Sequence, residues 1–289
     1  LIEEWKTERS KMGEAVYVFN RNGLRNLNFE TTDYLLGLFE HDHMKYNLDV
    51  VNQNLQHQEP TLTEMTVAAI KILQKEKNGY FLFVEGGMID QAHHYNYARL
   101  SLDETKEFSK AIEAARQMTD ESDTLIVVTA DHSHVFTYNG YPTRGNDVFG
   151  NAEVSDMDNL PFTTLSYANG PGFAGTYHSD GRRVNPTTND ITNPKLQYPA
   201  TVPRRIETHG GEDVGVWASG PMAHLFSGSY NQNSIPVIMA YILQVGPYAE
   251  KEECVSGSVN LVVTSILIGA MLMVCLLYTS DAADDLLCV

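Results

Sequence analysis

Two short apolar runs on either side of a long helical segment constrain the fold of this chain most strongly. The runs are Tyr80–Val84 and Leu125–Thr129, and each has the continuous apolar character of a strand that is buried on both faces. Residues 90–117 between them contain neither Gly nor Pro and are rich in Ala, Leu, Glu and Lys. Strand, helix and strand at this spacing predict a βαβ unit, and hence an α/β fold with a parallel sheet.

Further elements are predicted on both sides of this unit. Residues 17–19 are strand-like, and residues 61–77 have helical apolar spacing that begins at a Thr, with Glu64 three positions later completing a capping box. Near the end, residues 214–218 return to strand character and residues 235–245 form a closing helix before a Gly-Pro pair.

Residues 138–208 differ from the rest of the chain. They hold frequent Gly, Pro, Asn and Thr with only short apolar stretches, which is typical of a loop-rich subdomain. We therefore expect one main domain built from residues 1–137 and 209–250, with residues 138–208 inserted into it.

Charge and cysteine content limit the kinds of ligand that the main domain can bind. The chain has 20 basic and 37 acidic residues, a formal net charge of −17, so its field repels nucleic acid and attracts cations. Its three cysteines, Cys254, Cys275 and Cys288, all lie near the C-terminal end. Any metal ion held by the main domain must therefore bind His, Asp or Glu.

Three clusters of His and carboxylate residues lie beside the predicted strands, where α/β proteins bind ligands. Asp90 and His94 are four positions apart and share a helix face. Asp131 and His132 follow the second strand, and His134 could orient one of the metal ligands by a hydrogen bond without binding the ion itself. Residues 207–213 contain a third cluster around His209. Each pattern alone is also typical of a solvated helix face or loop, but together they favour a site for more than one metal ion.

The same clusters carry a family resemblance. The blocks 84–94, 129–134 and 207–214 resemble, in order, the metal-binding blocks of the animal membrane-anchored alkaline phosphatases. Similarity covers about residues 1–248 and includes shorter stretches at 37–40, 44–46, 140–145 and 223–225. The resemblance implies a three-layer α/β sandwich with a central, mostly parallel sheet between helices. It also implies that residues 138–208 form a crown subdomain, which lies over the active-site entrance and contributes to a homodimer contact.

Ligand assignments follow from the resemblance. It implies two zinc ions and one magnesium ion, with Asp90, His94 and His209 at the first zinc, Asp131 and His132 at the second, and Glu85 at magnesium. His134 would contact these ligands without binding an ion itself. The Phe39 carbonyl, Glu40 and Glu59 resemble contributors to the calcium site of animal members.

The implied activity is phosphomonoester hydrolysis by a two-zinc site through a phosphoserine intermediate. The 289 residues contain no Asp-Ser-Ala nucleophile motif and no phosphate-clamping arginine block, so we expect a C-terminal fragment that is itself inactive. The alternatives are a catalytically silent binding protein of the same fold and another member of the metal-phosphatase superfamily, such as a sulfatase or a cofactor-independent mutase. The run 129–134 and the crown-like insertion favour alkaline phosphatase.

The C-terminal part predicts attachment to a membrane. Residues 259–278 carry no charge and are long enough to cross a bilayer as a helix, and small residues precede them at 256–258. The resemblance implies a glycolipid anchor signal on the extracellular face of the plasma membrane, and a transmembrane span is the alternative. Residues 279–289 are acidic, whereas an anchor signal normally ends with its apolar run and the cytoplasmic end of a span normally carries Lys or Arg. We therefore interpret the sequence from about Cys275 onward as foreign to the native protein.

Overall fold

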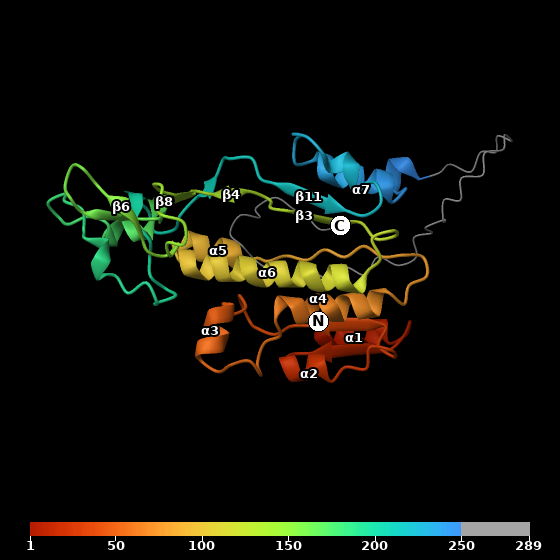
Figure 1. Cartoon of the computed structure of the whole chain (residues 1–289). Helices are drawn as coiled ribbons and strands as arrows, with labels where there is room; N and C mark the ends of the chain where they lie inside the picture. Colours follow the sequence, from red (N-terminus) through yellow and green to blue (C-terminus); the bar gives the residue numbers. More distant parts are fainter. Residues whose placement is uncertain (250–289) are drawn as a thin grey trace.

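The computed structural model describes residues 1–249, which form layers of helices and small sheets. The long helix α6 (Ala98–Met118) runs along the middle, with α4 (Leu62–Leu73) packed against one side. Strands β3 (Ile126–Thr129) and β11 (Val216–Ser219) lie on the opposite side of α6 (Figure 1). Beyond α4, β1 (Ala15–Val18) and β2 (Tyr34–Gly37) form a parallel pair.

The remaining helices are α1 (Ile2–Arg9), α2 (Arg21–Arg25), α3 (Asn47–Asn52), α5 (Met88–His94), α7 (Ser234–Ile242) and the 3₁₀ helices η1 (Pro171–Gly175), η2 (Pro186–Thr188), η3 (Ala223–Phe226) and η4 (Gly246–Tyr248). The remaining strands are β4 (Ser133–His134), β5 (Phe136–Tyr138), β6 (Asn151–Val154), β7 (Pro161–Thr163), β8 (Leu165–Gly170), β9 (Ala200–Pro203) and β10 (His209–Gly210). Pairs β1–β2 and β8–β9 are parallel, and the other pairs are antiparallel. Within residues 1–249 the expected central sheet is therefore present as separate small sheets.

Helix α4 begins where the capping motif predicts. The Thr61 hydroxyl accepts a hydrogen bond from the Glu64 backbone N–H at 3.2 Å, and the Glu64 carboxylate accepts one from the Thr61 N–H at 2.9 Å. These two bonds satisfy backbone groups that a helix start otherwise leaves unpaired. The buried face of α4 includes Ala68, Ile70 and Ile72, and the predicted helix is confirmed with an end at Leu73.

The helix expected over residues 90–117 is in fact two helices, because the chain turns at Asn96. This residue is fully buried with φ +57°, in the left-handed region. Its side-chain Oδ1 accepts a hydrogen bond from Gly172 N at 2.8 Å, and its carbonyl accepts one from Tyr198 N at 3.0 Å. Helix propensity does not include such distant hydrogen bonds, which here stabilise the break and end α5 at His94.

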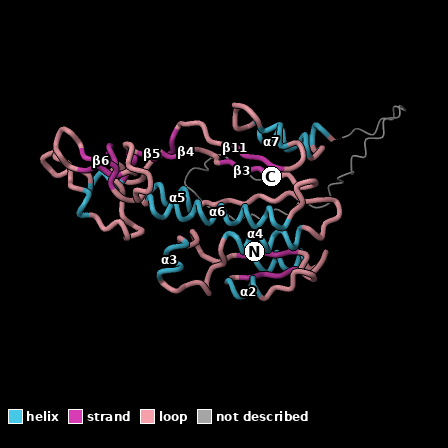
Figure 2. The backbone as a smooth tube through the Cα atoms, in the orientation of Figure 1, coloured by secondary structure: helices cyan, strands magenta, loops and turns pink. Residues whose placement is uncertain are grey.

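The strand expected at residues 80–84 is not paired, and this prediction is wrong for the described part of the chain. The segment runs as a loop (Figure 2), and the side chains of Phe81 and Phe83 are 52% and 69% exposed. It lines a cavity of about 3200 Å³ that α6 and β3 also border. A strand buried on both faces needs neighbours, and β3 pairs instead with β11, antiparallel, which removes the expected parallel βαβ pairing.

Residues 138–208 have the loop-rich character that the sequence predicts and lie at one end of α6 (Figure 1). Strands β5, β8 and β9 form a sheet whose core contains Leu165, Tyr167, Tyr198 and Ala200 packed on Ala98 at the start of α6. The contact is close, since a Cβ on Gly172 would lie 1.8 Å from the Tyr198 carbonyl oxygen. This packing attaches the region to the segment that carries the His residues of α5.

No helix within residues 1–249 has the length and apolar character needed to cross a membrane. The anchor predicted at residues 259–278 and the tail at 279–289 lie outside the described residues.

Substituting Gly172 tests the packing of residues 138–208. We expect Gly172→Ala to lower the free energy of unfolding by about 1–3 kcal/mol or more, because its methyl group overlaps a backbone carbonyl that cannot move independently. Gly175→Ala in the same 3₁₀ helix meets open space and is the matched control. Chemical denaturation measures both, and equal stability of the two variants would contradict the packing.

Glu104 on α6 should make stability depend on pH. Burial, together with the charges of Asp103 and Glu107, raises the pKa of Glu104 to about 7, although its Oε1 accepts a hydrogen bond from Asn47 N at 2.6 Å. The folded state therefore holds a proton that the unfolded state has released, so this contribution to stability is lost as pH rises from about 4.5 to about 7. We expect Glu104→Gln to remove that loss and to be more stable than the parent above pH 7 by about 1–3 kcal/mol.

The measurement is the free energy of unfolding as a function of pH. Glu113→Gln, an exposed change on the same helix, is the control and should follow the parent curve. A Glu104→Gln curve parallel to that of the parent between pH 4.5 and pH 7 would rule out the assignment.

Candidate metal centre

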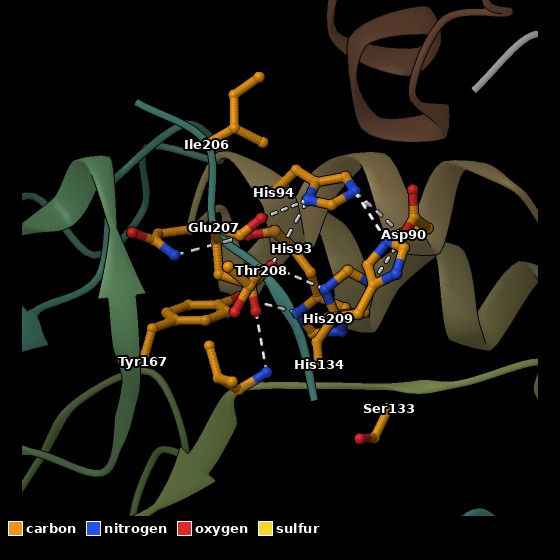
Figure 3. Close-up of polar contacts among 12 residues, drawn as sticks. Asp90, His93, His94, Ser133, His134, Tyr167, Ile206, Glu207, Thr208 and His209 are labelled. Carbon is orange, nitrogen blue, oxygen red and sulfur yellow. Dashed lines mark hydrogen bonds and ion pairs between the residues drawn. The ribbon is translucent and has the colours of Figure 1, made fainter. Parts of the chain in front are cut away.

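The His and carboxylate clusters predicted from the sequence converge at one place. Helix α5 supplies Asp90 and His94 on one face, and the antiparallel pair β4–β10 places His134 directly opposite His209. Figure 3 shows these side chains pointing toward one another from the helix and the two strands. The i, i+4 spacing in α5 and the two-strand register thus bring together residues that are more than 100 positions apart.

Three ligand atoms form an almost equilateral triangle. Asp90 Oδ1 lies 3.3 Å from His94 Nε2 and 3.3 Å from His209 Nε2, and the two nitrogens are 3.3 Å apart. A tetrahedral zinc ion with bonds of about 2.0–2.1 Å separates its ligand atoms by about 3.3–3.4 Å. The donor types and spacing therefore fit the first zinc ion of the sequence prediction.

The residues predicted for the second zinc ion adjoin this triangle. His132 Nε2 is 3.3 Å from Asp131 Oδ2 and 3.8 Å from Asp90 Oδ1, and its ring stacks on His209 with centroids 3.5 Å apart. Asp131 is exposed at the edge of the cavity. A carboxylate and an imidazole at 3.3 Å also match two ligands of a tetrahedral ion.

A buried carboxylate, Glu207, lies behind the cluster. It is 1% exposed, and its Oε2 lies 2.7 Å from His134 Nδ1 while its Oε1 accepts a hydrogen bond from Val135 N at 2.9 Å. The Glu207 backbone carbonyl lies 2.7 Å from His94 Nδ1. Because a carbonyl only accepts, Nδ1 of His94 is the donor, and in the neutral ring Nε2 keeps its lone pair toward the triangle.

His134 lies at the centre of this network and not only behind the ligands. Its Nε2 is 2.8 Å from Asp90 Oδ1, so the ring connects Asp90 with Glu207. His134 belongs to two groups of residues whose donor atoms are close enough to share an ion. One group is Asp90, His132, His134 and His209, and the other is His94, His134 and Glu207. The orienting role predicted for His134 is consistent with these contacts but remains a prediction.

Charges within the centre favour an ionised Asp90. Burial would raise the pKa of Asp90, but hydrogen bonds with His134 and His94 hold it well below its ordinary value. Burial also opposes a charge on His134, yet its bonds to Asp90 and Glu207 raise its pKa to about 9. In contrast, burial and the neighbouring His134 lower the pKa of His93 to about 3, so His93 stays neutral.

Glu85, the predicted magnesium ligand, lies in the electrostatic field of this centre. Burial, followed by the charges of Asp131 and Asp90, raises its pKa above the ordinary value. It borders the same cavity. A cation bound beside these three carboxylates would offset that repulsion.

The residues predicted for calcium lie elsewhere, between β2 and α4. The Phe39 ring packs against the core cluster of Val18, Leu24 and Ala68. Glu40 and Glu59 both contact the Lys45 ammonium group, at 2.6 Å for Glu59 Oε1. Their hydrogen bonds raise the pKa of Lys45, and the two carboxylates therefore face a cation of the chain itself.

Sequence reasoning missed the supporting residues Glu207, His93 and Tyr167. Glu207 belongs to the same sequence block as His209. Its position two residues before a predicted metal ligand, at the edge of a sheet, could have indicated that it supports the site. His93 stacks on His134, and its Nδ1 lies 2.9 Å from the Tyr167 hydroxyl. Tyr167 is 74 positions away in β8, and no local pattern indicates that contact.

Comparison with known proteins agrees with the resemblance. A family model described as alkaline phosphatase matches residues 1–245. The chain is 47% identical over 259 residues to the tissue-nonspecific alkaline phosphatase of Felis catus, covering 89% of this chain and 48% of that protein. It is 44% identical over 261 residues to a membrane-bound alkaline phosphatase of Bombyx mori, covering 89% of this chain and 46% of that protein. The chain thus spans about half the length of these relatives.

A solved structure supports the fold. The cold-active alkaline phosphatase of a psychrophilic Shewanella sp. is 20% identical and superposes with a TM-score of 0.55, covering 83% of this chain and 61% of that one. The α/β fold predicted from the sequence is therefore confirmed, although its central sheet is fragmentary within residues 1–249. With a family model that matches residues 1–245, this chain belongs to the alkaline phosphatase family.

Proposed function

We propose that this chain provides the metal-binding part of a phosphomonoester hydrolase, an alkaline phosphatase with two zinc ions and one magnesium ion. The observation that carries the proposal is the 3.3 Å triangle of Asp90 Oδ1, His94 Nε2 and His209 Nε2. Asp131 and His132 would hold the second zinc ion and Glu85 the magnesium ion. Bound zinc would supply Lewis-acid stabilisation of the charge that develops on a transferring phosphoryl group.

The protein residues do the positioning. Asp90, kept ionised by its imidazole neighbours, is the negative vertex of the triangle. The Glu207 carbonyl directs the Nε2 lone pair of His94 inward, and the Glu207 carboxylate fixes His134 against Asp90. A preorganised donor set of this kind loses little free energy to reorganisation when an ion binds or a substrate reacts.

The nucleophile of the proposed reaction is not among these residues. Hydrolysis would proceed through a phosphoserine, and the 289 residues contain no Asp-Ser-Ala motif. We therefore propose that the chain alone binds metal but does not turn over phosphomonoesters. A full-length protein that also lacks this motif would favour a second candidate, a catalytically silent binding protein of the same fold, and an activity assay of the intact protein separates the two.

Other parts of the chain would place this centre in its cellular context. Residues 1–137 and 209–250 would belong to the catalytic domain, and the crown-like residues 138–208 would lie over its entrance and contribute to a homodimer. The uncharged segment 259–278 would provide attachment at the extracellular face of the plasma membrane, by a glycolipid or as a span. A relative from Bombyx mori named as membrane-bound supports membrane association.

Removing one vertex of the triangle tests the metal assignment. We expect His209→Ala to lose about one zinc ion per chain, because two remaining protein ligands hold zinc far more weakly than three. Metal content after dialysis, measured by mass spectrometry, gives the result. His224→Ala, a change outside the cluster, should retain the parent content, and equal zinc in both variants would contradict the assignment.

Activity tests the proposed reaction. We expect the intact protein to hydrolyse p-nitrophenyl phosphate at alkaline pH and to lose that activity on chelation, with zinc and magnesium restoring it. The isolated 289-residue chain should bind zinc without hydrolysing the substrate. Hydrolysis that is indifferent to chelation would refute the metal mechanism, and an inactive but zinc-loaded intact protein would favour the silent binding protein.

A further inference from the structure

The two carboxylates that resemble calcium ligands are held together by a lysine of the same chain. Glu59 is only 3% exposed, and both of its oxygens are occupied: Oε1 lies 2.6 Å from Lys45 Nζ, and Oε2 accepts a hydrogen bond from Lys45 N at 2.8 Å. The same ammonium group contacts Glu40 Oε1. The position between the two carboxylates is therefore filled.

This arrangement does not fit calcium. A calcium ion needs six to eight oxygen ligands at about 2.3–2.6 Å, and it would have to share the space between Glu40 and Glu59 with a positive charge. With Lys45 in place, the two carboxylates already have one cation bound to both. A buried carboxylate without such a partner would be strongly destabilising, so the ammonium meets the same electrostatic need as an ion.

The sequence positions explain what this contact does for the fold. Glu40 lies in the loop after β2, and Glu59 lies two residues before the Thr61 cap of α4. Lys45, between them in sequence, ties the loop to the start of α4 through three hydrogen bonds. The Arg21 guanidinium also stabilises the start of α4, because it donates hydrogen bonds to the Gln56 carbonyl and to the Glu64 carboxylate.

We propose that the Lys45 ammonium takes the place of a divalent cation between Glu40 and Glu59, so that this part of the protein is calcium-independent. The inference stands on contacts outside the His cluster and does not require phosphatase activity. Its readouts are calcium binding and thermal stability, so its failure is distinguishable from failure of the proposed function.

The test uses the intact protein with zinc and magnesium saturating. Calcium is titrated to about 10 mM, tenfold above the weakest Kd of extracellular calcium modules, by calorimetry and by thermal melting. We expect the parent to show no saturable calcium binding and no rise in Tm. Lys45→Gln should have a lower Tm without calcium, and calcium should bind it saturably and restore the Tm.

Lys75→Gln is the matched control, since Lys75 is similarly half-buried and pairs with Asp33 outside this cluster. It should lose some stability that calcium does not restore. Calcium binding by the parent that Glu59→Gln abolishes would overturn the proposal, as would a folded Lys45→Gln protein that does not respond to calcium. The parent and Glu59→Gln titrations decide the question even if Lys45→Gln does not fold.

Discussion

The candidate metal centre depends on one buried carboxylate. Burying a carboxylate is costly unless it is fully hydrogen-bonded, and Glu207 meets this condition through His134 and the Val135 N–H. Its own backbone carbonyl binds His94 at the end of α5. A single residue thus connects α5, β4 and the segment that enters β10, and the proposed zinc ligands lie in or directly beside these three parts of the chain.

The break at Asn96 serves the same geometry. A continuous helix over residues 90–117 would lack the turn after His94, whereas the buried Asn96 ends α5 and binds Gly172 and Tyr198. Residues 138–208 therefore stabilise the backbone beside the site through these two hydrogen bonds. Through Tyr167, the same region also contacts His93, whose ring packs on His134.

Two clusters of carboxylates in this chain balance their charge differently. Around Asp90 the partners are imidazoles, and their donor atoms have the spacing that a zinc ion requires. In the proposed centre, metal ions would take the place of protons on these rings. Around Glu59 the partner is the Lys45 ammonium, which belongs to the chain and cannot dissociate. Resemblance to the family implies ions at both clusters, but in the second a cation of the chain already contacts both carboxylates.

The sequence by itself determined what depends on short-range pattern. The Thr61–Glu64 cap, the i, i+4 pair Asp90 and His94, and the loop-rich character of residues 138–208 all follow from neighbours within one or two turns, and the family blocks added His209. Only the tertiary structure decided the break at Asn96, the unpaired segment 80–84, and the roles of Glu207 and Lys45. Each of these depends on hydrogen bonds, ion pairs or strand partners formed between segments that the chain brings together only on folding, and local periodicity carries no record of such contacts.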